Sequence, residues 1–221
     1  EFDRLFRTHL RNVWTIAGLT PPDQFNQPIC RPRGMPEADL VTAPLALLNP
    51  SIDGLVTDFF EWRGAGRIKI QPPLGAMWKA EGLLADIQFG WSLDQLYLRL
   101  DPDEQSQPRQ SGLTVEIQLQ TPEHLYHPSF SLTPSEPYQF LLSQKLASGT
   151  WQEIGPYQSI CHRNIIELAV PIKGIQLTPG QELRMAILVL EHSMAVARYP
   201  HQHPAILTVP GPEFEAGLWR V

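Results

Sequence analysis

From about residue 51 onward, the chain carries the alternating apolar and polar pattern of β-strands. The segment TVEIQLQ (114–120) alternates without a break and predicts a strand with Val115, Ile117 and Leu119 facing inward. The longer segment IQFGWSLDQLYLRLD (87–101) predicts two strands joined by a short turn near Ser92–Gln95. Further strands are expected at 138–147, 150–158, 165–172, 183–192 and 205–209.

The spacing of these segments indicates the fold class. Gly, Pro, Ser and Asp separate the predicted strands at short intervals, and helical patterns are rare. This combination predicts a mainly β protein with an antiparallel β-sandwich, immunoglobulin-like or jelly-roll-like. Residues 183–192 are apolar on both faces, as expected for a central strand. Residues 76–87 have helical spacing and predict one interrupting helix, which Gly82 weakens.

The first 50 residues follow different patterns. In FDRLFRTHLRNVWTIA (2–17), apolar residues lie on one side of a helix and arginines on the other. Gly18 is a natural end for this helix. Residues 20–50 contain seven prolines and predict an extended strap along the domain. The predicted organisation is therefore a terminal helix (1–19), a proline-rich strap (20–50) and a β-sandwich domain (51–221).

Composition excludes several classes of partner. The net charge of −6 leaves no cluster of Lys and Arg of the kind that nucleic-acid binding requires. No apolar run approaches the roughly 20 residues of a membrane span. Cys30 and Cys161 lie far apart without motif spacing, and they fit reduced thiols in a cytoplasmic protein better than a disulfide framework.

The sequence contains no recognisable catalytic motif. A nucleophile elbow, a phosphate-binding loop, a dinucleotide fingerprint and a zinc-protease helix are all missing. The pairs His124/His127 and His201/His203 each offer two ligands without a third, which does not make a metal site. We therefore expect no catalytic residue, no metal and no cofactor in this segment.

The segment FFEWRGAG (59–66) crowds three aromatic residues around a glutamate. On a strand, Phe60 and Trp62 would share one core-facing side, and Glu61 would lie on the other. A buried Glu61 would need a partner, so a structural ion pair is expected. The candidate partners are Arg63, Arg67 and Lys79. Gly64 and Gly66 would then let the backbone turn sharply, so the segment is predicted to be structural.

The tryptophans offer a lead to a ligand, because sugar-binding surfaces stack pyranose rings on exposed aromatic side chains. The chain has six tryptophans. For each of them, the alternative to a sugar contact is a buried, structural position. Trp78, Trp151 and Tyr157 lie in polar, turn-rich surroundings. These three residues are the predicted carbohydrate contacts.

Several long stretches resemble a known protein family. They are FDRLFRTHLRNVWTIAGLTPP (2–22), IDGLVTDFFEWRGAGRI (52–68), GAMWKAEGLLADIQFGWSLDQLYLRLD (75–101) and PEFEAGLWRV (212–221). Together they resemble the C-terminal, non-catalytic region of bacterial glycoside hydrolase family 57 proteins. The IDG opening and the DQLYLRLD strand are also similar to family 9 carbohydrate-binding modules.

The resemblance implies a parent enzyme that acts on α-glucans such as glycogen or starch, of the α-amylase, glucanotransferase or branching type. Its catalytic glutamate and aspartate would lie in an upstream catalytic domain, so no catalytic residue is carried over to this chain. The helix at 2–17 would be the end of the helical region that joins that domain to the sandwich. Near Trp78 the family often has a polar residue such as histidine. This difference weakens the prediction of a carbohydrate site around Trp78.

Three hypotheses follow for the function. The leading one is a non-catalytic accessory domain that binds α-glucan, favoured by the tryptophans and by the resemblance. The second is a structural domain that braces the catalytic domain, which predicts a hydrophobic patch on the apolar side of residues 2–17. The third is an enzyme in its own right, which predicts two carboxylates facing each other at glycosidase separation.

Overall fold

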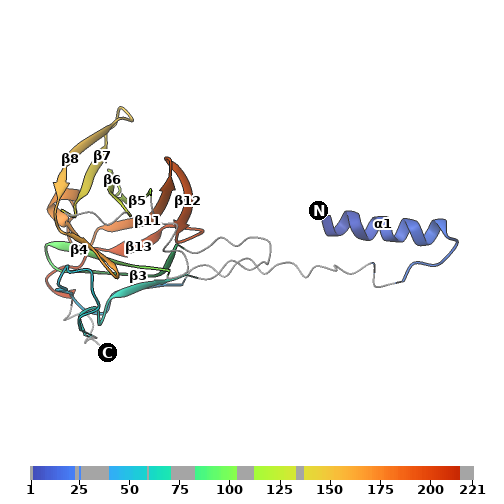
Figure 1. The fold of residues 1–221 in the computed structure, drawn as a ribbon, viewed down its shortest axis with the longest axis horizontal. Helices are drawn as coiled ribbons and strands as arrows, with labels where there is room; N and C mark the ends of the chain where they lie inside the picture. The colour runs from blue at the N-terminus through green and yellow to red at the C-terminus, as the bar shows by residue number, and fades with distance from the viewer. Residues whose placement is uncertain are drawn as a thin grey trace.

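The computed structural model describes residues 2–22, 25, 40–58, 60–70, 83–103, 112–132 and 137–214. Within them the chain forms two antiparallel sheets and one α-helix, α1 (Phe2–Ile16) (Figure 1). Sheet A has the order β1 (Leu40–Thr42), β2 (Gly66–Lys69), β3 (Leu84–Trp91), β4 (Gln95–Pro102), β10 (Ile166–Pro171) and β9 (Ile160–His162).

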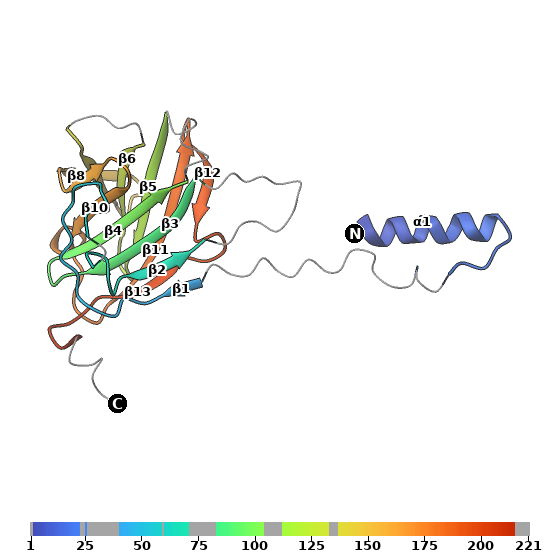
Figure 2. The same ribbon diagram turned by 60° about the horizontal axis from the view of Figure 1, so that its bottom comes forward.

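Sheet B has the order β12 (Met194–Tyr199), β11 (Glu182–Glu191), β5 (Leu113–Gln120), β6 (Leu125–Ser131), β7 (Phe140–Lys145) and β8 (Trp151–Tyr157). The strand β13 (Ala205–Thr208) also pairs with β11. A short 3₁₀ helix, η3 (Ile172–Ile175), follows β10. Figure 2 shows the strands of sheet A lying across those of sheet B, so the architecture is a sandwich.

The core lies between the two sheets because their strands alternate. In β5, Val115, Ile117 and Leu119 are fully buried, as the alternation of TVEIQLQ predicted. They pack in one cluster with side chains from sheet A such as Phe89 and Leu98. The predicted mainly β, antiparallel sandwich is confirmed.

Local predictions for the strands hold in most places. Ser92 N–H donates to Gln95 O at 2.9 Å, which closes the predicted turn between β3 and β4. The strand β11 lies between β5 and β12, so its central position is also confirmed. The helix predicted at 76–87 is wrong over 84–87, where the chain forms β3 and Ile87 is buried in the core. Leu83 is not helical either, and residues 76–82 lie outside the described residues.

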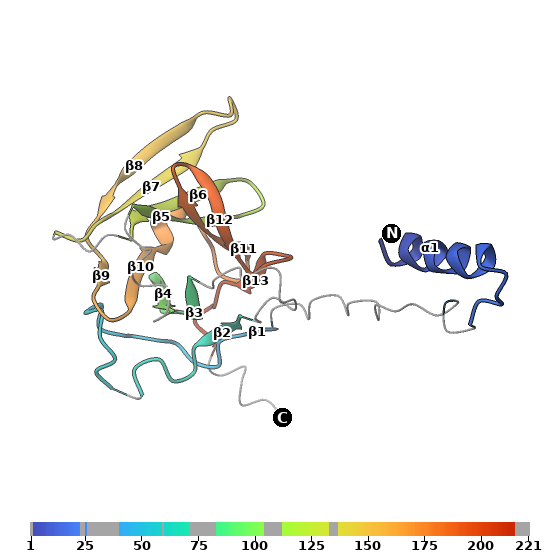
Figure 3. The same cartoon turned by 45° about the vertical axis from the view of Figure 1, so that its right-hand side comes forward.

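The helix α1 forms where the apolar period predicted it. Gly18 has φ +71°, and Leu19 N–H donates to Trp14 O at 3.0 Å, which is the backbone pattern of a glycine-terminated helix. In Figures 1, 2 and 3, α1 stands apart from the sandwich. Its exposed apolar side chains are Leu5, Phe6, Val13 and Ile16.

Sheet B is strongly curved. In Figure 1, β8 and β12 rise on either side of β5 and β6, on the side away from β3 and β4 of sheet A. Figure 3 shows the same curvature from a second direction. The outer face of sheet B, which is the face turned away from the core, is therefore concave.

Candidate functional site

The segment FFEWRGAG belongs to a loop that covers the outer face of sheet A. Residues 60–64 form a turn and not a strand, so Phe60 and Trp62 do not share a face as predicted. Phe60 is 59% exposed, whereas Trp62 is 7% exposed and packs with Leu48, Tyr97 and Ala169. The segment therefore forms a small second core on the outer side of sheet A, as its predicted structural role requires. Phe59 lies outside the described residues.

The Glu61 side chain caps this loop through hydrogen bonds. Its Oε1 accepts from Ser51 N–H at 2.7 Å, and its Oε2 accepts from the Thr57 hydroxyl at 3.1 Å. Of the three predicted ion-pair partners, Arg67 instead binds Asp86, with Nε donating to Oδ1 at 2.6 Å, and Arg63 lies over the Phe60 ring. Lys79 is outside the described residues. The predicted ion pair of Glu61 with Arg63 or Arg67 is therefore wrong, because backbone and hydroxyl donors are closer.

The loop is anchored by Glu167, a carboxylate in β10 that is completely buried. Its Oε2 accepts hydrogen bonds from Gly54 N–H at 2.9 Å and Asp53 N–H at 3.1 Å. Its Oε1 accepts from Trp62 Nε1–H at 2.9 Å. Burial raises the pKa of Glu167, and the hydrogen bonds from Gly54, Trp62 and Asp53 oppose that rise. The alternation of IIELAV places this glutamate on the outer face of sheet A, but a single sequence does not specify the loop that covers it.

The two glycines of the segment serve different purposes. Gly64 has φ +89°, the left-handed conformation that glycine adopts without strain, as the predicted sharp turn requires. Gly66 has no positive φ and begins β2. A Cβ at Gly66 would lie 2.6 Å from Phe89 Cζ and 2.7 Å from Thr42 O. Gly66 is thus needed for close packing and not for a turn.

The concave outer face of sheet B carries an exposed tryptophan. Trp151, on the edge strand β8, is 44% exposed, in agreement with its turn-rich sequence surroundings. One side of its indole lies against the His127 imidazole of β6, with ring centroids 3.9 Å apart. Lys145 Nζ lies 5.9 Å from the centre of the indole ring. The indole is therefore held in place by neighbours on two strands while much of it faces solvent.

Polar side chains surround Trp151 on this face. The alternation of β5 to β8 places the following residues there: Glu116, Gln118, His127, Ser129, Ser143 and Glu153. Ser143 lies directly opposite His127 on one side and Glu153 on the other. An exposed aromatic ring bordered by hydroxyl, amide and carboxylate groups can contact both the apolar face and the hydroxyl groups of a sugar.

Tyr157 lies on the opposite side of the sheet from Trp151. Trp151 and Tyr157 are six residues apart, so a regular strand would place both on one face. The β7–β8 register shifts between Leu142 and Ser143, which inserts one extra residue in β8. Tyr157 consequently stacks on the core residue Phe140 at 5.3 Å between ring centroids. The predicted exposed site for Tyr157 is therefore wrong, and Trp78 is outside the described residues.

His127 is neutral beneath the indole. Desolvation, together with the charge of Lys145, lowers the pKa of His127 to about 4. Its Nδ1 is 3.8 Å from Glu116 Oε2, and burial raises the pKa of Glu116. The lowered pKa means that the unfolded chain binds more protons between pH 4 and 6.5. His127 therefore makes the folded protein more stable as pH rises through this window.

We expect Trp151→Ala to raise the pKa of His127 by at least about one unit toward its ordinary value, because the indole excludes water from the imidazole. NMR titration of the His127 ring protons measures this change. The matched control is Met194→Ala, which truncates an exposed apolar side chain on the far edge strand β12. An unchanged His127 pKa in Trp151→Ala would contradict the role of the indole in desolvation.

Two carboxylates of this face, Glu116 on β5 and Glu153 on β8, lie three inter-strand spacings apart, which is about 14 Å between their backbones measured along the sheet. The carboxyl groups of glycosidases stand roughly 5 to 9.5 Å apart. No group of three or more potential metal ligands occurs among the described residues. Nor is any helix in the described part of the chain long and apolar enough to cross a membrane.

No protein-family model matches the chain, and no curated protein shows significant sequence similarity to it. The candidate functional residues are therefore those that the fold itself brings together, above all on the concave face of sheet B.

Proposed function

We propose that this chain is a non-catalytic accessory domain of an α-glucan-acting, cytoplasmic glycoside hydrolase, and that it binds carbohydrate on the outer face of sheet B. The observation that carries the proposal is Trp151, an exposed indole braced by His127 on a concave sheet face. An indole of this kind provides an apolar platform for a pyranose ring. The choice of α-glucan comes from the family 57 resemblance of the sequence.

The polar neighbours support the same function. Ser143 and Glu153 lie next to the indole on β7 and β8, and no hydrogen bond within the described residues occupies their side chains. These groups are free to bind sugar hydroxyls. Because His127 is neutral above about pH 4, binding at neutral pH does not require a charged imidazole.

Titration of the chain with glycogen, amylose and maltoheptaose tests the proposal by calorimetry and tryptophan fluorescence. Saturable binding is expected, and Trp151→Ala is expected to weaken it at least about tenfold, because a central aromatic contact typically dominates an interface. Met194→Ala, on the opposite edge strand β12, is the control and should bind as the unmodified chain does. Equal binding by both variants would place the site away from Trp151.

A second candidate is a bracing role against the upstream catalytic domain, which the exposed apolar side of α1 favours. Leu5, Phe6, Val13 and Ile16 are exposed there, in the pattern that this role requires. In the same titration, a folded chain that binds none of the three glucans would contradict carbohydrate binding. That result would favour the bracing role, with the catalytic domain as partner.

A further inference from the structure

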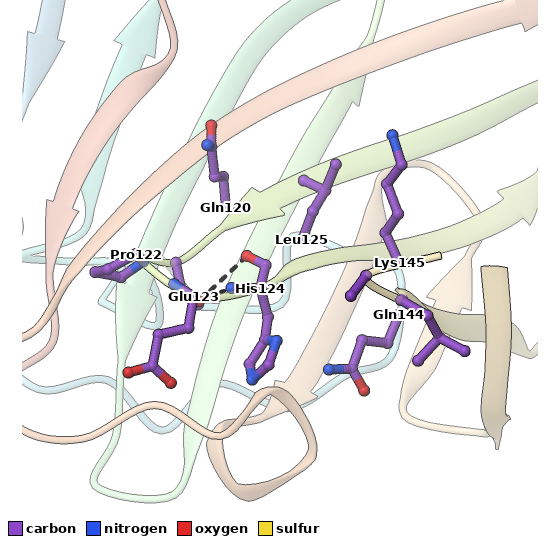
Figure 4. A pocket seen from close by; sticks show the side chains of 10 residues that line it. Gln120, Pro122, Glu123, His124, Leu125, Gln144 and Lys145 are labelled. Atoms are coloured by element: carbon purple, nitrogen blue, oxygen red, sulfur yellow. Dashed lines mark hydrogen bonds between the residues drawn. The ribbon is translucent and has the colours of Figure 1, made fainter. Parts of the chain in front are cut away.

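A hollow of about 360 Å³ lies at the end of sheet B where β8 begins. The β5–β6 turn (121–124) forms one side, and the chain at 144–147 forms the other. Figure 4 shows the side chains of Glu123, His124 and Gln144 pointing to one side of the sheet, and those of Gln120, Leu125 and Lys145 pointing to the other. Trp151 does not line the hollow, and the side chains of His124 and Gln144 point away from the side on which Lys145 lies by the indole.

The turn that frames the hollow is fixed by its own hydrogen bonds. The buried Thr121 hydroxyl oxygen accepts from His124 N–H at 2.9 Å and from Glu123 N–H at 3.3 Å, and the same hydroxyl lies 3.1 Å from His124 O. Thr121 N–H donates to His124 O at 2.9 Å. The His124 ring also packs edge-on against Tyr126 at 5.9 Å between centroids. The imidazole is therefore positioned before any ligand arrives.

Two polar side chains that line the hollow form no hydrogen bond within the described residues. They belong to His124 and Gln144, and both are half-buried. An amide and a neutral imidazole can each donate one hydrogen bond and accept another. A hydroxyl group has the same ability, so these two side chains suit a ligand rich in hydroxyl groups. Glu123 adds a carboxylate on the same side, which accepts hydrogen bonds from hydroxyl groups, whereas Lys145 points to the other side, where its Nζ lies by the Trp151 indole.

We propose that this hollow is a second ligand site, which takes one neutral, hydroxyl-rich ring, such as the terminal unit of a sugar chain. Its volume lies at the lower end of the range for small-molecule pockets, so it fits a single ring or a disaccharide and not a long chain. Only the choice of a sugar as ligand rests on the proposed function. The site itself rests on the rigid turn and on His124 and Gln144, whose side chains form no hydrogen bond in the described part of the chain.

Amide-resolved NMR titration of the intact chain with maltose tests the site. The expected result is a saturable shift of the Gln144 side-chain amide and the His124 backbone amide. Gln144→Leu removes the hydrogen-bonding head with little change of volume and should weaken maltose binding at these signals at least fivefold. The matched control is Gln139→Leu, an exposed glutamine that does not line the hollow.

The outcomes separate the two sites. Shifts at His124 and Gln144 that persist in Trp151→Ala and weaken in Gln144→Leu would support the hollow. Shifts confined to the surroundings of Trp151 would overturn it and leave the proposed function intact, whereas shifts nowhere would overturn both. If Gln144→Leu fails to fold, the shift map of the unmodified chain decides, because an unperturbed Gln144 amide alone overturns the proposal.

Discussion

Replacing Glu167 by glutamine is expected to lower the free energy of unfolding by about 1 to 3 kcal/mol, although the side chain keeps its size. The carboxylate accepts hydrogen bonds from Asp53 N–H, Gly54 N–H and Trp62 Nε1–H, and glutamine offers only one oxygen. Its amide NH₂ group must therefore face at least one buried donor. Buried donors without acceptors are costly because water cannot replace the lost partner.

Urea unfolding of Glu167→Gln, compared with Glu153→Gln, measures this effect. Glu153 is an exposed glutamate on β8, so its substitution should change stability by less than about 0.5 kcal/mol. Glu167→Ala should cost more than Glu167→Gln, because it leaves all three donors unpaired. Equal stability of Glu167→Gln and the unmodified chain would show that the anchor of the 51–65 loop does not depend on the carboxylate.

The sequence was informative wherever burial follows a regular alternation. In TVEIQLQ the period of two alone placed Val115, Ile117 and Leu119 in the core. The pattern did not indicate β6, because this strand contains Pro128. A proline has no backbone N–H group to donate, so its presence argues against a central strand. In the structure β6 is nevertheless central, and Pro128 has a register partner on β7, Leu142, and none on β5.

The candidate site was only partly predictable for the same reason. The exposed position of Trp151 followed from its polar, turn-rich neighbours. The sequence did not reveal the extra residue in β8, which places Tyr157 on the opposite face from Trp151. The support from His127 depends on pairing between β6, β7 and β8, which a single sequence does not specify. Glu167 had one detectable signal, a charge inside the apolar run IIELAV, but its three donors lie more than 100 positions away.

Gly66 shows how a small residue can be required without a special backbone conformation. Gly66 begins β2, which pairs with β1 and β3, and the Gly66 Cα lies opposite Phe89. Phe89 is fully buried, so its ring has no open space into which it could move. The oxygen of Thr42 belongs to the backbone of β1 and is similarly constrained.

Gly66→Ala is therefore expected to destabilise the protein by about 3 kcal/mol, because the new methyl group would overlap both Phe89 and Thr42 O. The control is Gly149→Ala, at a glycine with φ +85° and nothing within 4 Å of the added Cβ, which should cost only about 1 kcal/mol of backbone strain. Urea unfolding of the two variants measures the difference directly. A Gly66→Ala protein as stable as Gly149→Ala would mean that β1 moves away from β2 at little cost. In that case close packing against Phe89 and Thr42 would not explain why residue 66 is a glycine.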